Sequence, residues 1–104
     1  MQTQQIKFHI GQIMRHKNFG YRGVIYDVDA LYSGTEVWYQ RVAKSRPAKD
    51  KPWYHVMVDG SDITTYVAES NMLVADDLEA INHPLTEVYF INFSNGKYIL
   101  PLKQ

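Results

Sequence analysis

The stretch RHKNFGYRGVIYDVD, residues 15–29, joins a basic, glycine-containing turn to a run of β-branched and aromatic residues. Residues 18–20 carry the Asn and Gly that favour a turn. After the turn, Val24 and Tyr26 fall on one side of an extended chain, with the period of two that is typical of a strand. Residues 12–16 read as the preceding strand. The sequence therefore predicts a β-hairpin at the centre of the fold.

Segments on both sides of this hairpin also have the character of strands. Before it, IKFHI at 6–10 alternates apolar and polar residues, and Gly11 then predicts a bulge or a sharp bend. After it, WYHVMV at 53–58 and ITTYVA at 63–68 flank the turn sequence DGSD and predict a second hairpin. KYIL at 97–100 predicts a closing strand.

Two segments have helical features. Ser33 followed by Glu36 has the spacing of a capping box, so we expect a short helix near residues 35–45 that Pro47 ends. Residues 84–93 fit either a helix opened by its proline or a strand rich in Val, Ile, Tyr and Phe. The Asn-Gly pair that follows suits a helix end or a hairpin turn equally well.

These elements predict one domain over residues 1–104, mainly β, built as a small SH3-like antiparallel β-barrel with one or two short helices. Its expected buried positions are Val24, Tyr26, Val56 and Val58. The chain has no cysteine, which excludes disulfides and thiolate metal sites. It has no apolar run long enough to cross a bilayer and no secretion signal at its start, so we expect a cytoplasmic protein without membrane partners.

Charge is distributed unevenly although the net charge is zero. Residues 1–52 carry a net charge of +5 and the remainder −5, which indicates either an anionic partner for the basic half or mutual neutralisation in the fold. A hairpin tip and a proline-bounded loop hold most of the cations, and both could contact DNA phosphates. The candidate DNA-binding residues are Arg15, His16, Lys17, Arg22, Arg41, Lys44, Arg46, Lys49 and Lys51.

Five aromatic residues are candidates for a binding surface, because aromatic rings stack on bases or hold apolar peptides. They are Tyr21, Trp38, Trp53, Tyr54 and Tyr66. Trp53 and Tyr54 should point to opposite sides of their strand, so at most one of the two belongs to such a surface.

Signals for catalysis and metal binding are weak. His55 and Glu69 have no nucleophile motif beside them, and we interpret them as a strand residue and a carboxylate that caps the next turn. Asp27 and Asp29 could share a cation but are more simply a solvated strand end. The histidines show no metal-binding spacing, and they are His9, His16, His55 and His83. We therefore expect no enzyme activity, metal or cofactor.

Several motifs together resemble the YccV-like family, the family of heat-shock protein HspQ. They are IGQIMRHKNFGYRGVIYDVD, EVWYQRV, RPAKDKPWYHVMVDG, TTYVAESNM and HPL, and the resemblance runs from about residue 6 to residue 100. It implies an SH3-like barrel, a helix after HP that favours the helical interpretation of residues 84–93, and a non-enzymatic heat-stress protein that binds double-stranded, hemimethylated DNA.

The resemblance also implies a link to regulated protein degradation, with the ATP-dependent Lon protease and denatured client proteins as partners. A homo-oligomer is compatible with it. The alternative function is an adaptor or specificity factor for a protease, in which DNA binding is incidental. The insert RVAKSRPAKDK is more basic than in some family members, which favours the nucleic-acid function.

Overall fold

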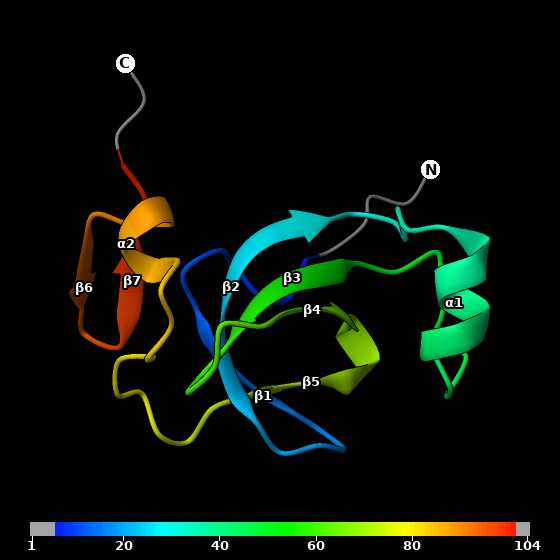
Figure 1. Cartoon of the computed structure of the whole chain (residues 1–104), viewed down its shortest axis with the longest axis horizontal. Helices are drawn as coiled ribbons and strands as arrows, with labels where there is room; N and C mark the ends of the chain where they lie inside the picture. Colours follow the sequence, from blue (N-terminus) through cyan, green and yellow to red (C-terminus); the bar gives the residue numbers. More distant parts are fainter. Residues whose placement is uncertain (1–5, 102–104) are drawn as a thin grey trace.

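The main sheet has five antiparallel strands in the order β4-β3-β2-β1-β5. The computed structural model describes residues 6–101. Figure 1 shows this sheet between α1 at one end of the molecule and a small C-terminal unit at the other. The strands are β1 (Ile13–His16), β2 (Arg22–Asp29), β3 (Trp53–Val58), β4 (Thr64–Ala68) and β5 (Met72–Val74). Both predicted hairpins are present, as β1–β2 and β3–β4.

Strong curvature follows from the connection between the two edge strands. β4 and β5 lie at opposite edges, yet the single 3-10 turn η1 (Glu69–Asn71) joins them. In a flat sheet these edges would be about 19 Å apart, and so short a link spans at most about 14 Å. The sheet therefore curls, but β4 and β5 do not pair with each other. The mainly β prediction is confirmed, whereas a closed SH3-like barrel is not.

Both faces of the curled sheet are buried. Ile25, Tyr54 and Val56 belong to one core cluster, inside the curl, while Val24 and Met57 belong to another that includes residues of the C-terminal unit. A β-bulge between residues 25 and 27 of β2 shifts the register against β3. The expected burial holds fully for Val24 and Val56. For Tyr26 and Val58 it holds in part, because both are half-buried.

Helix α1 (Glu36–Val42) confirms the predicted helix but not its predicted cap. The side chain of Thr35, not Ser33, accepts a hydrogen bond from the backbone N–H of Trp38 at 3.1 Å. Ser33 instead donates its hydroxyl to the carbonyl of Leu31. The capping-box prediction is therefore wrong by two residues, because threonine provides the same acceptor oxygen.

The C-terminal unit contains α2 (Thr86–Tyr89) and a small sheet of β6 (Asn92–Ser94) and β7 (Lys97–Ile99). Residues 84–93 are thus neither wholly helix nor wholly strand. Asn95 and Gly96 both have positive φ, at 53° and 76°, as a two-residue hairpin turn between β6 and β7 requires.

The predicted strand at residues 6–10 is wrong. Phe8 is buried, but Ile6 and Ile10 are exposed and no strand forms there. Gly11 does mark the predicted bend, with φ of 93°, and a Cβ at this position would lie 2.2 Å from the carbonyl oxygen of Tyr98. The backbone N–H of Gly11 donates to the carbonyl of Ile25, and the Gly11 carbonyl accepts from the N–H of Tyr98. Residues 6–10 lie outside the strand ladders.

Candidate functional site

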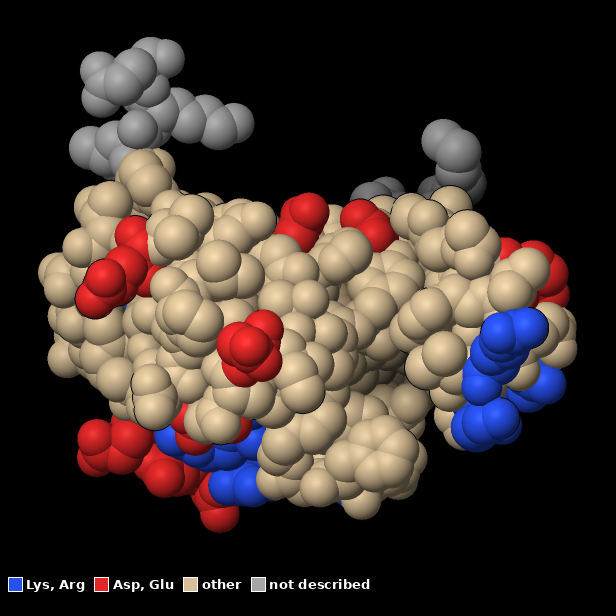
Figure 2. Space-filling model, in the orientation of Figure 1, with Lys and Arg blue, Asp and Glu red and all other residues tan. Residues whose placement is uncertain are grey.

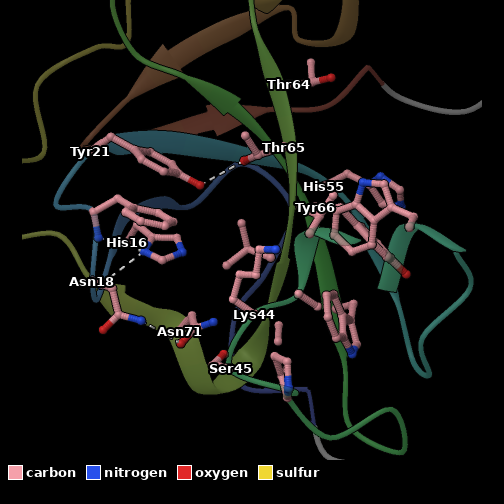
Figure 3. A pocket seen from close by; sticks show the side chains of 18 of the residues that line it. His16, Asn18, Tyr21, Lys44, Ser45, His55, Thr64, Thr65, Tyr66 and Asn71 are labelled. Atoms are coloured by element: carbon pink, nitrogen blue, oxygen red, sulfur yellow. Dashed lines mark hydrogen bonds between the residues drawn. The ribbon is translucent and has the colours of Figure 1, made fainter. Parts of the chain in front are cut away.

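A cavity of about 570 Å³ lies between the turn of the β1–β2 hairpin and the loop after α1, with β3 and β4 behind it (Figure 3). Among the described residues that line it there is no Asp or Glu, and Lys44 is the one Lys or Arg. Most of its walls are aromatic or aliphatic. This composition suits a planar ligand that is neutral or negatively charged.

His16 is held as a fixed hydrogen-bond donor in the wall of this cavity. Only 6% of the residue is exposed, and its ring stacks on Phe19 with centroids 4.6 Å apart. Its Nδ1 accepts hydrogen bonds from the backbone N–H groups of Asn18 and Phe19, each at 3.1 Å. Burial lowers the pKa of the His16 imidazole, so the ring is neutral near pH 7 and its proton resides on Nε2.

The Nε2–H of His16 has no hydrogen-bond partner within residues 6–101. Every described side-chain N or O that is fully buried has a hydrogen-bond partner. The unpartnered Nε2 of His16 is therefore accessible to solvent. Figure 3 shows the ring at the cavity, beside Tyr21 and Asn18. A nearly buried imidazole thus presents one N–H group to whatever occupies this space.

Four of the five predicted aromatic residues line the cavity. They are Tyr21, Trp38, Trp53 and Tyr66. Tyr54 does not, because it is fully buried on the other side of β3, where its hydroxyl donates to Glu69 Oε2 at 2.6 Å. The prediction that Trp53 and Tyr54 point to opposite sides is confirmed by their places in different core clusters.

A hydrogen-bond network fixes the Tyr66 side of the cavity. The hydroxyl of Tyr66 donates to Asp29 Oδ2 at 2.7 Å, and His55 Nε2 lies 2.9 Å from the same oxygen. Burial, followed by the bond to Asp29, raises the pKa of Tyr66 to about 12. Ligand atoms of Asp27, Asp29 and His55 lie within 4.8 Å of one another, so these are the residues that could hold a cation. Asp29 already accepts from two neighbours, which favours a structural role.

His55 and Glu69 form no pair. His55 contacts Asp29, whereas the Glu69 carboxylate accepts from Tyr54 and from the backbone N–H of Lys7 at 3.4 Å. The predicted turn-capping role of Glu69 is replaced by this link between β3 and the N-terminal segment. The two side chains that could have suggested acid–base chemistry belong to separate networks.

The hairpin arginines face the acidic half of the chain. The Arg22 side chain is 12% exposed, with Nη2 3.0 Å from Asp59 Oδ2 and Nη1 donating to the carbonyls of Asp77 and Glu79 at 2.9 Å. Arg15 pairs with Asp76 at 3.4 Å. Arg22 therefore has a structural role, because its guanidinium joins β2 to the segment after β5.

Two cations of the loop after α1 also have partners within the fold. Arg46 Nη1 donates to the carbonyls of Tyr39, Gln40 and Ala43 at the C-terminal end of the helix. Lys49 bonds Glu36 and lies 4.3 Å from the centroid of the Tyr39 ring. Both residues stabilise α1 and its loop.

The other predicted cations are exposed and have no partner in the described part of the chain. They are Lys17, Arg41, Lys44 and Lys51. Figure 2 shows the Lys and Arg side chains of one face in two groups, one at the α1 end and one beside acidic side chains at the opposite end. The Lys and Arg side chains seen on this face do not form one continuous basic patch.

Sequence reasoning missed Phe19 as a site residue. This side chain is 80% exposed at the hairpin tip and lines the cavity. The sequence contained a signal for this residue, since a phenylalanine between Asn18 and Gly20 is unusual in a polar turn. Asn71 and Thr65 also line the cavity, and they come together with the hairpin tip only in the folded chain.

Within residues 6–101, neither helix has the length and apolar character that a membrane crossing requires. Comparison with protein families gives a match over residues 6–97, which is nearly all of the described chain. The matching family is described as hemimethylated DNA-binding protein YccV-like. The resemblance inferred from the hairpin and PWYHV motifs is thereby confirmed, and the chain belongs to the YccV-like family.

Proposed function

We propose that this protein binds double-stranded DNA with a preference for hemimethylated sites, without catalysing a reaction. The family match over residues 6–97 carries this proposal. The cavity supports it, because aromatic walls without acidic residues are compatible with a polyanion that carries flat bases. His55 and Glu69 lie in separate networks, which fits a binding role.

The contacts to DNA phosphates are proposed for the cations that have no structural partner. These are Lys17 on the hairpin tip and Arg41, Lys44 and Lys51 around α1 and its loop. Arg22 and Arg46 are excluded from this set because their guanidinium groups hold the fold together. Phosphate contacts of this kind give affinity and orientation but carry no information on methylation.

In the cell, we infer an HspQ-type role in the heat-stress response that couples DNA binding to regulated protein degradation. A Lon-type protease and denatured client proteins would be its protein partners, and a homo-oligomer is compatible with it. The support is the resemblance of the hairpin and PWYHV motifs to that family.

A protease adaptor is the second candidate, and one surface favours it. The C-terminal unit exposes apolar side chains on α2 and its flanks, among them Val88 at 71% and Ile91 at 63%. Exposed apolar groups that gather in this way are typical of protein-binding surfaces. In addition, Arg15 and Arg22 are neutralised within the fold, which reduces the charge available for DNA.

Titration of the protein with unmethylated, hemimethylated and fully methylated duplexes of one sequence tests the proposal. We expect the hemimethylated duplex to bind most tightly at each salt concentration, with a linear fall of log K against log salt. Equal affinity for the three duplexes would contradict the methylation preference. Absence of DNA binding, together with protease stimulation that Val88→Asp or Ile91→Asp abolishes, would favour the adaptor.

A further inference from the structure

We propose that the cavity between the hairpin tip and the loop after α1 receives one nucleotide that leaves the DNA duplex, with its methylated base against the aromatic wall. This inference rests on the proposed DNA binding and assigns the recognition of the methyl group to a place in the fold. A base that stays stacked in a duplex cannot enter a concave site, so the nucleotide must swing out.

The volume and walls of the cavity fit this occupant. About 570 Å³ is within the range of pockets that enclose one small ligand. Phe19, Trp38 and Tyr66 line the cavity and supply aromatic rings to a flat base. Phe19 is 80% exposed, so its outer face is free to stack. Stacking of this kind accepts any base, and an added methyl group increases the apolar contact.

His16 provides the polar contact that a nucleobase needs. Its Nε2–H is an unpartnered donor on a residue that is 94% buried, since 6% of it is exposed, and Nδ1 is occupied by two backbone amides. Ring nitrogens and carbonyl oxygens of bases accept such a bond. Because stacking on Phe19 and the two amides fix the imidazole, the donor is oriented before the base arrives.

The charge of the cavity distinguishes a nucleotide from other ligands. Lys44 lines it without a partner, and no carboxylate is present among its described lining residues. Figure 3 shows Lys44 between the His16 side and the Tyr66 side, where its ammonium can reach a phosphate. A methylated ammonium group would instead require a carboxylate beside the aromatic rings. The arrangement therefore favours an anionic nucleotide.

Duplexes with an abasic site opposite the methylated nucleotide test the inference directly. An unpaired base costs less to extrude, so this duplex should bind more tightly than the intact hemimethylated duplex, by about tenfold or more. An abasic site five base pairs away is the control and should give no such gain. Duplexes with N6-methyladenine and with 5-methylcytosine are both titrated. The later measurements use the modification that the protein binds more tightly.

Variants connect the effect to the cavity. Phe19→Ala should weaken binding of the hemimethylated duplex about 5- to 100-fold and remove most of the abasic gain, because one stacking face is lost. Val74→Ala, at a residue of β5 that is 67% exposed, is the matched control and should change neither the affinity for the hemimethylated duplex nor the gain from the abasic site. Phe19 is exposed, so its replacement leaves the core intact, which circular dichroism and the unfolding midpoint verify.

The outcomes separate this inference from the proposed function. If the protein prefers hemimethylated DNA but neither the abasic site nor Phe19→Ala changes binding, the nucleotide pocket is wrong and the DNA-binding proposal stands. If no duplex binds, both are wrong. If Phe19→Ala weakens binding of a denatured protein and leaves DNA binding unchanged, the cavity is a peptide site and the inference is overturned.

Discussion

The two faces of the β1–β2 hairpin use neighbouring residues for different purposes. Arg15 and Arg22 are cross-strand partners on one face, where they meet Asp59, Asp76 and Asp77. On the other face His16 packs beside Tyr21 at the cavity, and none of the described residues that line the cavity is acidic. Two like charges directly opposite each other destabilise a ladder unless counter-charges are near.

This contrast shows that one basic motif can contain both a structural link and a binding surface. Alternation along a strand sends consecutive side chains to opposite faces, so the charge count of the motif does not give its role.

The largest effect is expected for Arg22→Ala. The variant removes a guanidinium whose side chain is 12% exposed and that donates to Asp59 and two backbone carbonyls, so the free energy of unfolding should fall by about 2 kcal/mol. Urea unfolding followed by fluorescence measures it. Arg41→Ala, at an exposed cation without a partner, is the matched control and should change stability by less than about 0.5 kcal/mol. Equal effects of the two would contradict the structural role of Arg22.

A smaller loss is expected for Arg46→Ala, which extends the comparison to the loop after α1. The side chain bonds three carbonyls at the end of the helix, partly in contact with solvent, so its removal should cost about 1 kcal/mol. Thermal unfolding, with Lys44→Ala as control, measures the difference. A neutral Arg46→Ala would show that water replaces these bonds without cost.

The cavity face should make stability depend on pH. Because burial lowers the pKa of His16 below its ordinary value of 6.5, the folded state disfavours the protonated ring. The contribution of the neutral His16 to stability is thus complete above pH 6.5 and is lost as the pH falls through the lowered pKa of the folded state. Urea unfolding between pH 7 and 5 should show a steeper loss for the natural protein than for His16→Gln. Parallel curves would contradict a buried, neutral His16.

The smallest effect on stability is expected for Lys17→Ala, although its effect on binding should be distinct. Lys17 is exposed and unpartnered, so stability should change by less than about 0.5 kcal/mol. The slope of log K against log salt for DNA should decrease by about 1, since one phosphate contact is lost. The loss should be the same for hemimethylated and unmethylated duplexes. An unchanged slope would remove Lys17 from the DNA interface.

Elements whose sequence signals are short in range could be predicted from the amino-acid sequence. The alternation and turn residues of 12–29 and 53–68 predicted both hairpins, and α1 lies within the predicted 35–45. These signals work because side-chain period and turn chemistry depend on near neighbours. Segments with few patterned residues were predicted wrongly for the same reason. The strand predicted at 6–10 is absent, and β5 (Met72–Val74) was missed because three residues hold too little pattern.

Which of the basic and aromatic residues are available for binding depends on contacts between distant parts of the chain. Arg22 and Lys17 look alike in the sequence, but Arg22 meets Asp59 across 37 positions whereas Lys17 is left at the surface. The cavity likewise requires the hairpin tip to lie opposite the loop after α1, an arrangement set by the curl of the sheet. Contacts between residues far apart in the chain depend on packing of the whole domain, and no local pattern encodes them.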